Sequence, residues 1–152
     1  SKCNNIAVLG GGVGVPPMYM LCRQLIQQGK KVNVILGFNT SSEVFYEDAF
    51  KALGADVTAT PVDGSYGMKG FVTDAMRELD TYTYFYTCGP EPMLKAIMQC
   101  LPTQIVYVYC NPATLSKNLA VLTSKYDVEL IQPLDMFPQT PHVECVVLLQ
   151  RK

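Results

Sequence analysis

Residues 6–17 read IAVLGGGVGVPP, and this stretch decides the fold. Ile6–Leu9 is a short apolar run typical of a buried strand, and the glycine turn GGGVG at residues 10–14 follows it. Pro16 and Pro17 then suit the first turn of a helix, where a missing backbone N–H costs nothing. A strand that enters a helix through glycines is the opening unit of doubly wound α/β folds, which hold phosphates at this turn. The two prolines remove two amide donors, so the loop alone supports a nucleotide site and a tight packing turn equally.

The rest of the chain alternates strand-like and helical patterns. Five strand-and-helix units in succession favour a three-layer α/β fold, a doubly wound and mainly parallel sheet with strand order 3-2-1-4-5. No helical pattern separates the last two strand-like runs, so we expect them to pair antiparallel as a C-terminal edge hairpin, with the last strand beside the fifth. No linker divides residues 1–152, which indicates a single Rossmann-like domain. The expected strands are residues 6–9, 32–38, 56–61, 82–88, 104–110, 128–137 and 144–150.

Apolar spacing predicts the helices between these strands. A helix capped by Ser41 or Ser42 is expected to turn Phe45 inward. A later helix, Pro90–Leu101, is expected to bury the leucine at its end, and Asn111 is expected to cap the helix after it. A further helix is expected near residues 72–79.

Composition excludes several classes of function. The chain of 152 residues is 49% hydrophobic and 16% charged, which is typical of one globular domain. Its net charge of −1 argues against binding to RNA through the phosphate backbone. No apolar run is long enough to span a membrane. Six cysteines without a C-x-x-C pair, and His142 as the single histidine, predict no metal site. Reduced thiols and a start without a signal segment favour a cytoplasmic protein.

Four separated blocks closely resemble the electron-transfer subunit of the type B dihydroorotate dehydrogenases, over about residues 5–101. They are LGGGVGVPPMYMLCRQL, ILGFNTSSEVFYEDAF, DGSYGMKGFVTDAM and FYTCGPEPMLKAI, in this order. The resemblance implies a ferredoxin-reductase-type nucleotide domain of pyrimidine biosynthesis. That family passes electrons from NADH through FAD and a [2Fe–2S] cluster to FMN on a partner subunit. Its flavin domain and cluster cysteines have no counterpart in this sequence.

The same resemblance implies a binding site for NAD. The glycine loop at residues 10–14 would face the pyrophosphate, and the loop that contains Asp63, Gly64 and Ser65 would lie beside the cofactor. The C-G-P-E motif, residues 88–91, would lie near the nicotinamide. Asn39 follows the second strand, where a ribose would lie, and no Arg or Lys there would meet a 2′-phosphate, so NAD is favoured over NADP. The implied residues are Gly10, Gly11, Gly12, Gly14, Asn39, Asp63, Gly64, Ser65, Cys88, Gly89, Pro90 and Glu91.

The tail resembles a second, unrelated family. The runs IVYVYCNPATLSKNLAVL and VELIQPLDMFPQTPHVECVVLL, within about residues 105–152, are similar to the C-terminal end of the RNA uracil-5-methyltransferases, which use S-adenosylmethionine. Tyr109 departs from that family, which usually has Ser before Cys-Asn-Pro. The resemblance implies that Cys110 attacks C6 of uracil and that Glu144 removes the C5 proton. The cofactor motif and the RNA-binding module of those enzymes are missing, so we expect neither S-adenosylmethionine nor RNA to bind.

The two resemblances meet near residues 102–106, which predicts a chimera of a reductase-like segment, residues 1–104, and a methyltransferase-like segment, residues 105–152. A designed or recombined chain is favoured over a natural fusion. Three functions stay open. The first is a nicotinamide-nucleotide-binding domain without complete catalytic activity, in which the glycine loop takes a small nucleotide or an anion. The second is a methyltransferase remnant, and the third is a purely structural hybrid in which Cys110 and Glu144 are vestigial.

Overall fold

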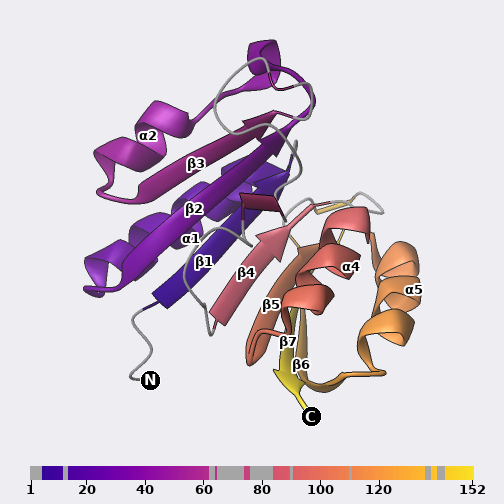
Figure 1. Ribbon diagram of the computed structural model, residues 1–152. Coiled ribbons are helices and arrows are strands. Elements are labelled where there is room, and N and C mark those ends of the chain that lie inside the picture. Colours follow the sequence, from indigo (N-terminus) through magenta and orange to yellow (C-terminus); the bar gives the residue numbers. More distant parts are fainter. Residues whose placement is uncertain are drawn as a thin grey trace.

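The computed structural model describes residues 5–11, 14–61, 64, 74–75, 84–89, 91–109, 111–135, 138–139 and 143–152. Its centre is a seven-stranded sheet in the order β3-β2-β1-β4-β5-β7-β6 (Figure 1). The strands are β1 (Asn5–Gly11), β2 (Lys31–Phe38), β3 (Asp56–Pro61), β4 (Tyr84–Cys88), β5 (Gln104–Tyr109), β6 (Tyr126–Leu134) and β7 (Glu144–Arg151). The helices are α1 (Val15–Gln27), η2 (Ser41–Glu43), α2 (Glu47–Ala52), α4 (Glu91–Cys100) and α5 (Pro112–Leu122).

The strand pairing confirms the expected fold class. Strands β3, β2, β1, β4 and β5 pair in parallel, in the predicted order. The last strand, β7, runs antiparallel between β5 and β6, so β6 forms the edge of the sheet. The prediction that the fifth strand lies beside the fourth is confirmed, because Phe85 pairs with Ile105 and Thr87 with Tyr107.

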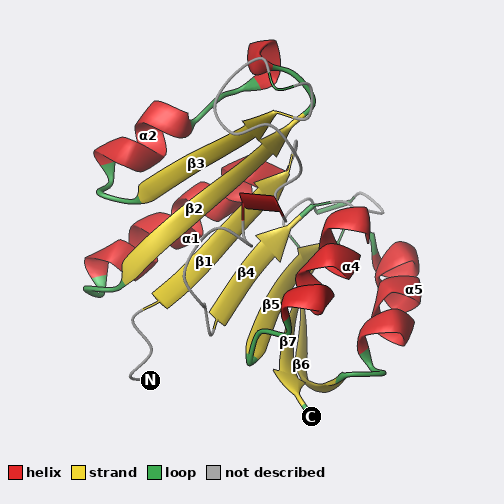
Figure 2. Ribbon diagram, in the orientation of Figure 1, coloured by secondary structure: helices red, strands yellow, loops and turns green. Residues whose placement is uncertain are grey.

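Helices cover both faces of the sheet, and each face has its own apolar core (Figure 2). On one face, Val15, Met18 and Cys22 of α1 pack with Phe50 of α2 against β1 and β2. On the other face, α4 and α5 pack against β4, β5 and β7, with Ile97 and Leu122 fully buried. This second core contains residues from both segments of the chain.

Local sequence chemistry fixes the ends of α1 and α5. Helix α1 carries proline within its first turn, as predicted, and the chain leaves it through Gly29 at φ 76°, a conformation that suits glycine. Asn111 caps α5, as predicted: its side-chain oxygen accepts hydrogen bonds from the backbone N–H groups of Ala113 (3.0 Å) and Thr114 (3.3 Å).

Two helix predictions were wrong in detail. The segment after β2 does not form one helix from Ser41, because Tyr46 adopts φ 66° and separates the 3-10 turn η2 from α2. Phe45 is therefore 40% exposed, and Phe50 is the aromatic residue that enters the core. Leu101 is also exposed, because its φ of 49° ends α4 and turns it away from the core. Most of the helix expected near residues 72–79 lies outside the described residues.

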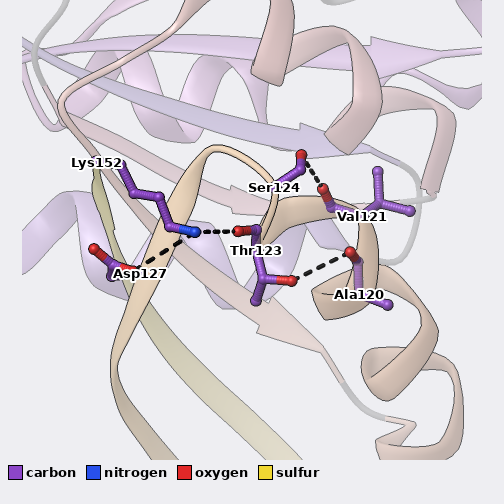
Figure 3. Close-up of polar contacts among 6 residues, drawn as sticks. All are labelled: Ala120, Val121, Thr123, Ser124, Asp127 and Lys152. Carbon is purple, nitrogen blue, oxygen red and sulfur yellow. Dashed lines mark hydrogen bonds and ion pairs between the residues drawn. The ribbon is translucent and has the colours of Figure 1, made fainter.

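Polar contacts join the end of α5 to β6 and β7 (Figure 3). The hydroxyl groups of Thr123 and Ser124 donate to the carbonyls of Ala120 (3.2 Å) and Val121 (2.8 Å), which closes the last turn of the helix. Lys152 Nζ donates to the Thr123 carbonyl at 2.7 Å and lies 3.9 Å from Asp127 Oδ1. These contacts hold the first residues of β6 beside the last residue of the chain.

In the described part of the chain, no helix combines the length and the apolarity needed to cross a membrane.

Candidate functional site

The predicted site residues in the described part lie at the carboxyl edge of the parallel sheet. Gly10 on β1 pairs in register with Leu36 on β2 and with Cys88, the last residue of β4. The strand order reverses at β1, since the chain builds the sheet first toward β3 and then toward β5. Doubly wound folds bind ligands outside the strand ends at this reversal. The topology therefore brings the glycine loop and the C-G-P-E motif together.

The glycine loop and the end of β4 are in direct backbone contact. A Cβ atom at Gly14 would overlap the Cys88 carbonyl and would lie 3.1 Å from the Cys88 sulfur. A Cβ atom at Gly89 would overlap the end of the Met93 side chain and lie 3.6 Å from the Gly11 amide nitrogen. Gly14 is thus required for packing, whereas a side chain at Gly89 would have to displace the flexible end of Met93.

Few backbone donors remain at the start of α1. Gly14 is the N-terminal cap residue and provides no side-chain bond, and Pro16 and Pro17 carry no N–H. Gly14 and Val15, the other two described residues at this end, are both buried. The start of α1 therefore provides a smaller donor set than the usual phosphate-binding helix start.

The end of β2 carries a second group of polar residues. The Asn39 backbone N–H donates to Glu43 Oε2 at 3.2 Å, and the hydroxyl groups of Thr40 and Ser42 are 2.8 Å apart. A pocket of about 510 Å³ begins in the same segment, a volume in the range of small-molecule sites. It is lined by Ser41, Val44, Phe45, Tyr46, Glu47, Asp48 and Ala49. The sequence analysis missed this pocket, because it expected Phe45 to turn inward. In the structure Phe45 and Tyr46 are both exposed and line the pocket.

The other predicted cofactor residues are distributed along the same edge. Gly64, at φ 72°, follows β3, and its amide donates to the Pro61 carbonyl at 3.1 Å. Glu91, at the start of α4, accepts a 2.5 Å contact from Lys95 one turn later, so its carboxylate is already paired. Gly12, Asp63, Ser65 and Pro90 lie outside the described residues.

Of the two residues that the methyltransferase resemblance implies, Cys110 and Glu144, the structure describes Glu144. Glu144 is the first residue of β7, and its neighbour Cys145 pairs in register with Tyr109, the last residue of β5. Glu144 therefore lies at the edge where β5 ends, as the sequence predicted. Cys110 lies outside the described residues.

A buried polar pair next to the site was also missed. Asn118 on α5 donates to the Tyr107 hydroxyl at 3.0 Å, and both side chains are buried. Burial raises the pKa of Tyr107, the Asn118 hydrogen bond lowers it, and the charges of Tyr109, Cys88 and Glu91 raise it further. The apolar spacing on which the sequence reasoning relied gives no signal for such a pair.

The described residues contain no group of three or more His, Cys, Asp or Glu side chains that could hold a metal ion. Cys22, Cys88, Cys100 and Cys145 are thiols. Cys22 is fully buried, and this burial raises its pKa to about 11. It is therefore protonated at neutral pH and lies in the α1 core, away from the sheet edge.

Two family models match the chain. Residues 8–99 match the oxidoreductase NAD-binding domain, and residues 90–152 match the tRNA (uracil-5-)-methyltransferases. Because the first match covers more than half of the chain, the protein belongs to the oxidoreductase NAD-binding domain family. The second match confirms the mixed resemblance seen in the sequence, and the two matches overlap at residues 90–99, of which residues 91–99 lie in α4.

Individual proteins show the same division. The chain is 49% identical over 102 residues to a dihydroorotate dehydrogenase B (NAD(+)) electron transfer subunit from Geobacillus sp. (strain WCH70). This match covers 66% of the chain and 39% of the relative, so the chain spans about two fifths of the length of such relatives.

The solved structures differ in how much of the chain they cover. An NADH-dependent reduced ferredoxin-NADP oxidoreductase, 31% identical with a TM-score of 0.59, covers 68% of the chain and is itself covered to 39%. The Pyrococcus abyssi tRNA (uracil-54, C5)-methyltransferase, 25% identical with a TM-score of 0.61, covers 95% of the chain and is covered to 33%. The methyltransferase fold thus extends over nearly the whole sheet, whereas the reductase fold accounts for about two thirds of the chain.

Proposed function

We propose that this chain is a nicotinamide-nucleotide-binding domain of the dihydroorotate dehydrogenase electron-transfer-subunit type. In this proposal it carries a methyltransferase-type C-terminal segment and performs no complete reaction of its own. The observation that carries the proposal is the backbone contact of Gly14 with Cys88 at the point where the strand order reverses. The contact joins the two motifs on which the reductase resemblance depends, and the family match spans both.

Each group of edge residues has a proposed role in this site. Gly10, Gly11, Gly12 and Gly14 face the pyrophosphate of NAD, where a loop without side chains permits close approach. Asn39 lies beside the ribose, and Asp63, Gly64 and Ser65 lie beside the cofactor. Cys88, Gly89, Pro90 and Glu91 lie near the nicotinamide. Because Pro16 and Pro17 carry no N–H, the start of α1 offers fewer donors than usual, and we expect weak binding, with Kd in roughly the millimolar range, or about −4 kcal/mol.

The proposal assigns the chain a binding role without catalysis. Nicotinamide can exchange a hydride only with an acceptor such as a flavin. We propose that the FAD and [2Fe–2S] sites, and the partner subunit implied by the name of the relatives, depend on parts of the relatives that this chain does not span. The partner of this chain is then a small nucleotide or an anion at the glycine loop.

The domain proposal follows from the overlap of the two family matches. We propose one domain, in which a reductase-like segment, residues 1–104, and a methyltransferase-like segment, residues 105–152, complete one sheet. Strand β5 adds to β4 in parallel, with Phe85 opposite Ile105. The chimera proposal is supported by the shared core, where Phe85 and Ile97 pack with Tyr107 and Leu149.

A titration with NADH, followed by nucleotide fluorescence, tests the proposed function. We expect a saturable change in NADH fluorescence that excess NAD reverses by competition. Glu144→Gln is the matched control, because Glu144 lies at β7, beyond the loop of β1 and the end of β4; it should bind NADH as the unmodified chain does. The absence of any saturable change at millimolar NADH would overturn the proposal.

The second candidate is a methyltransferase remnant, which is favoured by the position of Glu144 beside the end of β5 and by the 95% coverage of the chain by the Pyrococcus abyssi enzyme. Calorimetry with S-adenosylmethionine separates the two candidates. We expect no heat of binding. Tight binding of S-adenosylmethionine with none of NADH would reverse the order of the two proposals.

A further inference from the structure

The edge strand β6 carries an unusual concentration of exposed apolar side chains. Four of the nine large hydrophobic residues that are exposed in the described part of the chain lie on this one strand: Val128 (37%), Leu130 (52%), Ile131 (48%) and Leu134 (41%). Soluble proteins protect edge strands with charged side chains (lysine above all), proline, β-bulges, short length or a covering element. The sequence of β6, YDVELIQPL, is nine residues long and contains neither Lys nor Arg.

The side of β6 that faces away from β7 pairs with no strand in the described part of the chain. Within the residues described, β7 is the strand that pairs with β6, and every β6 residue after Tyr126 is exposed. The register with β7 shows that the exposed apolar residues lie on both faces of the sheet. Ile131 pairs with Val147, which faces the buried core under α4 and α5, whereas Leu130 pairs with Leu148 on the opposite face. An added strand would therefore gain apolar neighbours on both faces.

The charge pattern of β6 selects the direction of such pairing. Asp127 and Glu129 lie in its first half, and its second half, residues 131–134, is uncharged. A parallel copy would place acid beside acid, which is destabilising, whereas an antiparallel copy places each acidic half beside an uncharged half. The exposed residues Lys125 and Asp135 flank the strand, so antiparallel pairing also brings each lysine near the aspartate of the other copy.

We propose that β6 is a dimerisation edge whose occupant is β6 of a second copy of this chain, paired antiparallel about a two-fold axis. A two-fold arrangement uses the same edge on both copies and is closed, so it ends at two molecules. It forms one continuous sheet through the dimer and buries Leu130 and Ile131 of both copies. The bulge between Val128 and Leu130, together with Pro133, limits the regular pairing to part of the strand.

Sedimentation equilibrium or light scattering of the full chain over a concentration series tests the proposal. We expect a dimer, and we expect Leu130→Lys to raise the dimer Kd by at least about tenfold, because an edge lysine opposes strand pairing. Met20→Lys is the matched control, since Met20 is also 52% exposed but lies on α1; its dimer Kd should be unchanged. Circular dichroism checks that both variants stay folded.

A charge exchange tests the antiparallel arrangement separately. Lys125→Asp and Asp135→Lys should each weaken the dimer, and the double variant should recover most of the affinity. Any of three results would overturn the proposal: a monomer at all concentrations, an open-ended aggregate, or a dimer whose Kd does not change with Leu130→Lys. Additive losses in the double variant would overturn the antiparallel pairing.

Discussion

At the scale of single residues, Gly14 has the least room for a side chain among the glycines that the structure describes. A Cβ atom there would lie 2.6 Å from the Cys88 carbonyl carbon, and neither partner can move without shifting α1 or β4. We expect Gly14→Ala to lower the free energy of unfolding by about 1–3 kcal/mol, the usual cost of overpacking. Urea denaturation measures this loss.

Gly29 provides the comparison for that substitution. No atom lies within 4 Å of a Cβ atom built at Gly29, but its φ is +76°. Gly29→Ala should cost about 1–2 kcal/mol through backbone strain alone, and Gly29→Asn should recover part of that loss, because asparagine tolerates this conformation. If Gly14→Asn recovered stability in the same way, the steric account of Gly14 would be wrong.

The buried thiol of Cys22 makes stability depend on pH. Burial raises its pKa to about 11 in the folded chain, from about 9 for an unburied thiol, so the folded state holds a proton that the unfolded state releases above pH 9. The contribution of Cys22 is fully present below pH 9 and is lost as pH rises toward 11. Between pH 8 and pH 10 the unmodified chain should lose roughly 1 kcal/mol more stability than Cys22→Ala. Equal losses from urea denaturation at the two pH values would contradict this account.

At the scale of elements, the cap of α5 can be tested by substitution. Asn111 satisfies two backbone N–H groups at the start of this helix, and α5 covers β5 and β7. Asn111→Ala should lower the free energy of unfolding by about 1 kcal/mol. Asn39→Ala is the control, because Asn39 is exposed and its hydrogen bond to Glu43 uses the backbone; its effect should stay within about 0.5 kcal/mol. A smaller loss for Asn111→Ala than for the control would show that the cap is not needed.

The elements that the sequence predicted well are those whose pattern is local. The strand β1, the proline-led start of α1 and the Asn111 cap follow from residues adjacent in the chain, and all three are confirmed. The segment between β2 and α2 was mispredicted because its conformation depends on ring packing. Tyr46 contacts Tyr19 of α1 at 5.3 Å between ring centroids, and this contact crosses elements. Within the candidate site, the strand order was enough to predict that the glycine loop meets Cys88. The strand order gave no indication of the pocket beside Tyr46.

At the scale of the whole molecule, the two segments share one core and should unfold together. Leu9 and Phe85 of the reductase-like segment are buried with Ile105, Leu122 and Val147 of the methyltransferase-like segment. We expect a single cooperative transition in which far-ultraviolet circular dichroism and the reactivity of the buried Cys145 thiol change at the same urea concentration. Two separated transitions would show that the segments are independent units.

The position of β7 between β5 and β6 constrains the order of assembly. Strand β6 comes first along the chain, yet it has no place to attach until β7 has paired with β5. Either the two strands pair with each other first and join the sheet as a hairpin, or β6 stays unpaired, with its apolar side chains exposed, until β7 has joined. During synthesis this interval ends only when residues 144–151 have left the ribosome. Pulse-labelling hydrogen exchange during refolding should accordingly find the amides of β6 protected no earlier than those of β7.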